Sequence, residues 1–167
     1  MKEEEIKSKE NDDNFIKLTL NDIAFLVDVN SPGRKSFDKI QALSSVSGKI
    51  QYWVYKIWKN LLTHMKDIET IKFELIKKFC TKDENGEPIT RESKENKSVL
   101  LYTFTDENKI LFNKAFLEFT ETEETIPIHK ITINSDLLEK MNARAKIEES
   151  LTGTDMVNLE KIFDFVE

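Results

Sequence analysis

The chain has 167 residues, 39% hydrophobic and 34% charged, which is the size of one ordinary domain with one modest core. Three Pro and four Gly exclude collagen-like and Gly/Ser-linker architectures, and eleven Phe exclude a wholly disordered chain. The net charge of −6, from 31 acidic and 25 basic residues, gives no general attraction to nucleic acid or anionic lipid, so we expect neither as a direct partner.

A single cysteine excludes an internal disulfide framework and a cysteine-cluster zinc site, and it fits a reducing cytoplasm. The first seven residues contain no apolar signal-peptide core, and no stretch approaches the roughly eighteen consecutive apolar residues of a membrane span. We therefore expect neither a signal peptide nor a membrane span.

The first part of the chain is charged. Residues 1–14 contain six acids and three lysines, which predicts a charged flexible tail, with a single α+β domain over residues 15–167. Alternation over residues 15–20 predicts a strand. Asn21 or Asp22 is then expected to cap a short helix that ends at Ser31-Pro32-Gly33.

The strongest pattern is a long apolar stripe with alternating steps of four and three. Its members are Ile50, Val54, Ile57, Leu61, His64, Ile68, Ile71, Leu75 and Phe79. This spacing predicts one long helix that runs from about Phe37 or Ser44 to Phe79. A second apolar flank, which includes Trp53, favours packing inside a bundle. We expect one core that buries Trp53, Ile57, Leu61, Ile68 and Phe116 together.

The region after the long helix is polar. A polar loop is expected at residues 81–98, with a turn at Asp83–Pro88, because Asn-Gly tolerates positive φ and proline lacks an amide donor. Val99–Phe104 then has the composition of a strand. Thr105 or Asp106 is expected to cap a Phe-rich helix that pairs with the long helix.

The last third of the chain is expected to contain one strand and two helices. Thr125–Ile133 predicts an edge strand with a bulge near Pro127, and Asn134 or Ser135 caps the helix that follows. Thr154-Asp155 begins a short amphipathic helix that uses Met156, Leu159, Ile162, Phe163 and Val166. The expected fold class is therefore α+β and predominantly helical: a long-helix hairpin, a small β-sheet and a short C-terminal helix.

Few residues offer catalytic or metal-binding chemistry. Asp83, Asn85 and Glu87 alternate as in a calcium loop, but the expected glycine position and terminal glutamate are missing, so a turn is favoured. His64 on the apolar stripe and His129 in the expected strand have no metal-ligand spacing. We predict no metal, no cofactor and no catalytic residues, and the residues of any binding site remain unknown.

Two further features have a functional and a structural interpretation. Cys80 follows the C-terminal end of the long helix, where the helix dipole disfavours a thiolate, so a structural thiol is expected. The run Lys49–Lys59 is aromatic and basic, which is typical of a nucleic-acid surface, because aromatic side chains stack on bases while lysines neutralise phosphates. Its helical spacing instead favours a core face, with Trp53 inward, and a solvated lysine rim.

The order of several short motifs along the chain resembles that of a known family. They are Lys17–Asp22, Ser47–Ile50, Leu75–Phe79 followed by Lys82–Glu87, Asn113–Phe116, Ile126–Ile131 and Leu151–Glu160. Their order resembles a family of uncharacterised small proteins from tailed phages and prophages of Gram-positive bacteria, over residues 15–167. The tail 1–14 and the segment Ala143–Ser150 are additions to that pattern. The resemblance implies a phage origin and an α+β fold dominated by a helical hairpin, and it supplies no catalytic residues.

Two functional hypotheses follow. The first is a non-enzymatic phage protein that acts by protein–protein interaction, as a virion component or an assembly factor. The alternative is an intracellular phage inhibitor of a host defence or nucleic-acid enzyme, because an acidic protein can present carboxylates to a basic groove. The expected partner is a phage or host protein or a second copy of the chain, in the host bacterial cytoplasm or in the virion.

Overall fold

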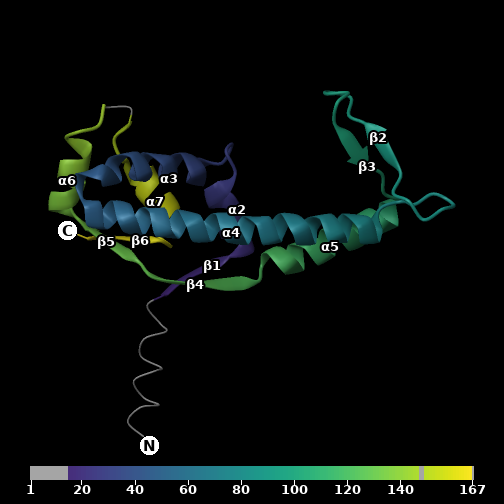
Figure 1. Ribbon diagram of the computed structural model, residues 1–167, viewed down its shortest axis with the longest axis horizontal. Helices are drawn as coiled ribbons and strands as arrows, with labels where there is room; N and C mark the ends of the chain where they lie inside the picture. Colours follow the sequence, from purple (N-terminus) through teal and green to yellow (C-terminus); the bar gives the residue numbers. More distant parts are fainter. Residues whose placement is uncertain (1–14, 147–148, 167) are drawn as a thin grey trace, which may run out of the picture. The chain divides into compact units, whose positions relative to one another are not determined.

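The computed structural model describes residues 15–146 and 149–166, so the tail predicted at residues 1–14 lies outside the described residues. The elements, labelled in Figure 1, are β1 (Phe15–Thr19), α2 (Leu20–Val27), α3 (Pro32–Leu43), a 3-10 turn (Ser44–Val46), α4 (Gly48–Phe79), β2 (Thr90–Glu92), β3 (Leu100–Tyr102), α5 (Asp106–Thr120), β4 (Glu123–His129), β5 (Ile131–Asn134), α6 (Ser135–Asn142), α7 (Gly153–Leu159) and β6 (Phe163–Val166). The expected predominantly helical α+β fold is confirmed.

The chain divides into two compact units. Unit 1 comprises the described residues up to Met65 together with those from Glu123 onward, and unit 2 is Lys66–Thr122. Helix α4 contributes its first half to unit 1 and its second half to unit 2. The single domain expected over residues 15–167 stays a prediction.

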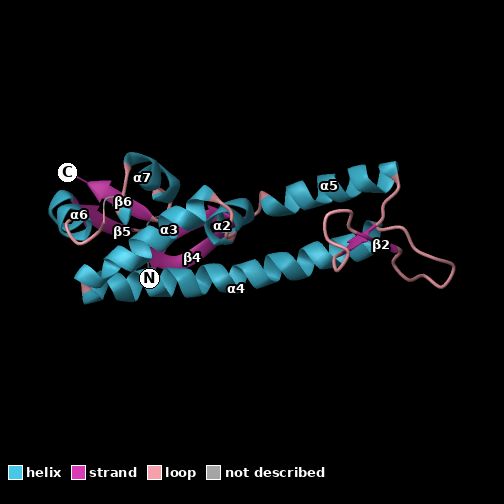
Figure 2. Cartoon of the chain, turned by 90° about the horizontal axis from the view of Figure 1, so that it is seen from above, coloured by secondary structure: helices cyan, strands magenta, loops and turns pink. Residues whose placement is uncertain are grey.

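Unit 1 contains most of the buried apolar side chains. Strand β1 pairs antiparallel with β4, and β5 pairs parallel with β6. Figure 2 shows these strands in magenta, close to helices α2, α3 and α7. Fully buried side chains from these elements and from the first half of α4 form the core, among them Ile16, Leu18, Ile23, Phe37, Ile40, Ile57, Leu61, Ile126, Ile133, Leu159 and Phe163.

The first helix begins earlier than predicted. Its N-cap is Thr19, whose hydroxyl accepts a hydrogen bond from the Asp22 amide while the Asp22 carboxylate accepts one from the Thr19 amide. Leu20 is therefore the first residue of α2 and not the last of the strand, and the prediction of Asn21 or Asp22 as the cap is wrong. This reciprocal capping box satisfies two helix-end amides at once, which a single cap at Asn21 would not do.

Ser31-Pro32-Gly33 begins a helix and does not end one, because α2 already ends at Val27, so the predicted helix end is wrong. Ser31 is the N-cap of α3, and Pro32 is its first residue, where the missing amide donor costs nothing. Gly33 is buried so closely against Phe25 that an added Cβ would lie 2.8 Å from the Phe25 carbonyl oxygen. The long helix α4 begins only at Gly48, so the predicted starts at Phe37 and Ser44 are both wrong.

The predicted strand at Thr125–Ile133 is two strands. β4 and β5 are separated at Lys130 and pair with different partners. Phe15 pairs with His129 and Ile16 with Ile126, so Pro127 and Ile128 are skipped. The bulge predicted near Pro127 is therefore present, at a residue that has no amide to donate to a ladder.

The C-terminal region is a short helix followed by a strand. The cap of α7 is Thr152, and Gly153 is its first residue, so the start predicted at Thr154-Asp155 is one residue late. The residues Phe163 and Val166, predicted to be helical, belong to β6. Asn134 caps α6 as expected.

Unit 2 is a helical hairpin with a β-hairpin. The second half of α4 and the antiparallel α5 lie side by side in both views (Figures 1 and 2), and Lys72 of α4 places its ammonium 5.7 Å from the Phe116 ring centroid. Thr105 caps α5, one of the two caps predicted. The polar region at residues 81–98 contains β2, which pairs with β3, and the predicted turn has Gly86 at φ +82°.

The predicted core is partly right. Ile57, Leu61 and Ile68 are buried, as predicted, but Trp53 is 37% exposed and Phe116 is half-buried. Phe116 stacks instead on Phe112 of the same helix, with ring centroids 5.8 Å apart. The expectation of one core that buries all five residues is therefore wrong.

Candidate functional site

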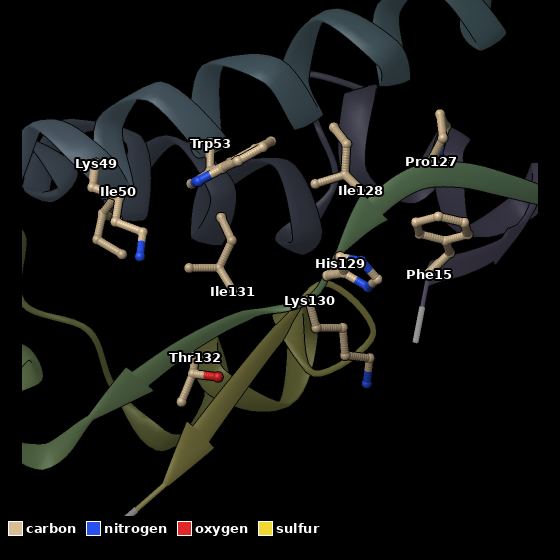
Figure 3. Close-up of a pocket in the computed structure, with 10 residues that line it drawn as sticks. All are labelled: Phe15, Lys49, Ile50, Trp53, Pro127, Ile128, His129, Lys130, Ile131 and Thr132. Atoms are coloured by element: carbon tan, nitrogen blue, oxygen red, sulfur yellow. The ribbon is translucent and has the colours of Figure 1, made fainter. Parts of the chain in front are cut away.

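A pocket of about 530 Å³ opens in unit 1 between α4 and the strands β4 and β5. We call it the Trp53 pocket. In Figure 3, the Trp53 side chain points from α4 toward the strands, and the side chains of Ile128 and Ile131 point from the strands toward α4. The complete lining is Phe15, Lys49, Ile50, Trp53, Pro127, Ile128, His129, Lys130, Ile131 and Thr132. Three segments that are far apart in sequence build this pocket.

The β4 bulge shapes one wall of the Trp53 pocket. The skipped residues Pro127 and Ile128 both line it, and the strand changes its pairing partner two residues later. Beyond the bulge, His129 stacks on Phe15 with ring centroids 4.8 Å apart. The break in the ladder that makes room for a proline therefore also provides the wall of the pocket.

A second candidate surface is the apolar exterior of unit 2. Within Lys66–Thr122, all of which the structure describes, the buried hydrophobic residues are Ile68 and Cys80. Large apolar side chains in the same unit that are more than a third exposed are Phe73, Ile89, Val99, Leu100, Leu101, Ile110, Leu111 and Leu117. This unit exposes more large apolar residues than it buries.

Two of the three most exposed of these residues lie on one side of α5, and the third, Leu100, belongs to β3. Ile110 is 69% exposed and Leu117 is 59% exposed, and their spacing of seven residues is two helical turns. Phe112 and Phe116 project from the opposite side, where Lys72 of α4 contacts Phe116. We define the side that carries Ile110 and Leu117 as the outer face of α5.

The candidate residues from the sequence are dispersed. His64 is half-buried on α4, whereas His129 is exposed and lines the Trp53 pocket. Cys80 is buried, and its Sγ lies 3.6 Å from the Lys77 carbonyl oxygen. The Asp83 carboxylate accepts hydrogen bonds from the amides of Asn85 and Glu87, as a turn requires.

The aromatic and basic run on α4 has the exposed rim that its spacing predicts, and Trp53 is the exception on the predicted core face. Tyr52 and Tyr55 are 51% and 58% exposed, and Lys56 lies 5.5 Å from the Tyr52 ring centroid. Trp58 is half-buried between Phe37 and the guanidinium of Arg34. Trp53, predicted to point inward, lines a pocket instead.

A polar cluster between α3 and α7 was not anticipated from the sequence. The Asp155 carboxylate accepts hydrogen bonds from Ser36 at 2.7 Å, Lys39 at 2.9 Å and Thr152 at 2.8 Å. Burial opposes ionisation of Asp155, but these donors outweigh it and lower its pKa to about 2. Asn158 also donates to Ser36. The cluster is fully hydrogen-bonded and joins two helices that are more than a hundred residues apart.

At the start of α2, hydrogen bonds to a carboxylate again outweigh the effect of its burial on the pKa. Burial opposes ionisation of Asp22, but hydrogen bonds from Lys161, at 2.7 Å, and from Thr19 lower the pKa of Asp22. Both carboxylates complete the capping box at the start of their helix and link that helix to a distant segment.

The described residues contain neither a metal-binding cluster nor a membrane-spanning helix. No group of three or more His, Cys, Asp or Glu side chains is arranged to hold a metal ion within residues 15–146 and 149–166. Over the same residues, none of the helices combines the length and the apolar composition needed to cross a membrane.

Comparisons with known proteins return no match. No family model matches the chain, and no curated protein and no solved structure matches it.

Proposed function

We propose that this chain is a non-enzymatic phage protein that acts by binding another protein, as a virion component or an assembly factor. The observation that carries the proposal is the apolar exterior of unit 2. This unit exposes eight large apolar side chains, whereas the hydrophobic residues that it buries are Ile68 and Cys80. Contiguous exposed apolar surface typically marks protein–protein contacts, and Ile110 and Leu117 lie on one side of α5. The phage setting rests on the order of the motifs between residues 15 and 167.

The outer face of α5 is the proposed contact. Ile110 and Leu117 form an apolar stripe, with Lys114 and Glu118 beside it as an exposed pair of opposite charges 4.0 Å apart. An apolar centre with a charged rim is the usual anatomy of a protein interface. The mixed charges of this rim favour a partner surface that is itself mixed in charge over a strongly basic groove.

The proposal is tested by co-purification from infected bacteria. A tagged wild-type chain is compared with Leu117→Glu in unit 2 and with Tyr55→Glu in unit 1 as a matched control, because Leu117 and Tyr55 are 59% and 58% exposed. We expect Leu117→Glu to lose a phage structural protein that wild type and Tyr55→Glu retain.

Mass spectrometry of purified particles separates the two roles. Detection of the chain in particles supports a virion component, whereas selective capture of an assembly intermediate without incorporation supports an assembly factor. A host defence or nucleic-acid enzyme as the partner that is lost in Leu117→Glu would replace the proposal by the inhibitor hypothesis. Equal partner binding by all three chains would contradict the outer face of α5 as the contact.

A further inference from the structure

The Trp53 pocket has the size and the lining of a small-molecule site. Its volume of about 530 Å³ falls within the range of about 300 to 1,000 Å³ that is typical of ligand pockets. The indole of Trp53 faces Ile128 and Ile131 across the opening (Figure 3), so a flat apolar group can lie between an aromatic wall and an aliphatic one.

The charges of the lining have one sign. It includes Lys49 and Lys130, and none of the ten described lining residues is acidic, although the chain as a whole carries a net charge of −6. Lys130 is already engaged, because its ammonium donates to the Glu160 carbonyl oxygen at 2.8 Å and lies 3.6 Å from Asp164.

Of the two lysines that line the pocket, Lys49 is the one whose ammonium can pair with a ligand. Among the described residues it has no carboxylate within ion-pair distance, and in Figure 3 its side chain extends from α4 on the same side as Trp53. An anionic group close to Lys49 would therefore gain an ion pair without displacing one that the protein already makes.

We propose that the Trp53 pocket binds a small amphipathic anion, which consists of a flat apolar ring system and one carboxylate, sulfonate or phosphate group. The ring lies against Trp53, Ile128 and Ile131, and the anionic group lies near the Lys49 ammonium. This inference concerns unit 1 and is independent of the function proposed for unit 2.

Two fluorescent probes that share one ring system test the proposal on the full chain. 1-Anilinonaphthalene-8-sulfonate carries the anionic group, and N-phenyl-1-naphthylamine lacks it. Lys49→Gln is expected to weaken binding of the sulfonate about threefold to fivefold and to leave the neutral probe unchanged, because it removes one partly exposed ion pair. Trp53→Ala should weaken both probes by about tenfold or more.

Lys56→Gln is the matched control, because Lys56 lies on the same helix but does not line the pocket. It should bind both probes as wild type does. Chemical shifts of backbone amides in the wild-type chain locate the probe without any substitution, and we expect changes at residues 49–53 and 128–132.

Any of four results would overturn the proposal. One is a wild-type chain that binds neither probe, and another is a Lys49→Gln effect of equal size on both probes. The third is a set of shift changes confined to residues 99–117, because the dye would then occupy the apolar exterior of unit 2. Loss of binding in Leu117→Glu but not in Trp53→Ala would lead to the same conclusion.

Discussion

Asp155 shows how one carboxylate can define a helix end and a tertiary contact together. It accepts from the Thr152 hydroxyl at the start of α7 and from Ser36 and Lys39 of α3. Its pKa of about 2 lies below the ordinary value of 3.8, so the folded state favours the ionised form more than the unfolded state does. The stabilisation is complete above the unfolded pKa and is lost as the pH falls from about 4 toward 2.

The first prediction concerns Asp155→Asn. We expect it to lower the free energy of unfolding near neutral pH by on the order of 2 kcal/mol, and the difference from wild type should shrink as the pH falls through 4 toward 2. Urea denaturation at several pH values measures both quantities. Asp164→Asn is the control, because the Asp164–Lys130 pair is exposed and should contribute less than about 1 kcal/mol. A pH-independent difference would refute this role for the Asp155 charge.

In helix α4, the apolar spacing predicts part of the buried face correctly, but it does not predict the position of Trp53 or the start of the helix. The stripe through Ile57 and Leu61 is buried as predicted, because steps of three and four residues place side chains on one helical face. Trp53 lies at the edge of that face, where spacing alone does not distinguish a core residue from the wall of a pocket. The start of α4 was missed because α3 and the 3-10 turn before it are also helical.

The C-terminal strand and the Trp53 pocket depend on contacts that are distant in sequence. β6 forms by parallel pairing of Phe163–Val166 with Ile131–Asn134, and four residues carry too little periodicity to show this. The pocket combines Phe15, two turns of α4 and the β4–β5 segment. A local pattern did indicate the bulge at Pro127, but not the cavity next to it.

The second prediction compares two adjacent leucines on α4. Leu61 is fully buried and Leu62 is 39% exposed, so they differ in burial but not in chemistry. Leu61→Ala should cost about 2–5 kcal/mol of unfolding free energy, and Leu62→Ala clearly less, because only Leu61 leaves a core cavity. Chemical denaturation of both variants measures the difference. Equal losses would show that the stripe on α4 is not the buried face.

At the scale of the whole molecule, the two units differ in how much apolar surface they bury. The buried apolar side chains belong to unit 1, with the exception of Ile68 and Cys80, among the residues that the structure describes. Local stability follows the density of buried contacts, so unit 2 should open at lower free energy.

The third prediction is a difference in hydrogen exchange between the units. Amides of the β2–β3 hairpin and of α5 should exchange faster than those of α3 and of the β1–β4 pair, because their hydrogen bonds are covered by fewer buried side chains. Hydrogen–deuterium exchange on the full chain measures this directly. Uniform protection would instead favour the single cooperative domain expected from the sequence.

Site-specific photocrosslinking tests whether the outer face of α5 contacts another protein. p-Benzoylphenylalanine is placed at Leu117 in unit 2 or at the similarly exposed Tyr55 in unit 1, and the chains are irradiated in infected bacteria. We expect a discrete light-dependent adduct with one phage protein from position 117 and none with that protein from position 55. Adducts of the same protein in similar yield from both positions, or none from position 117, would contradict it.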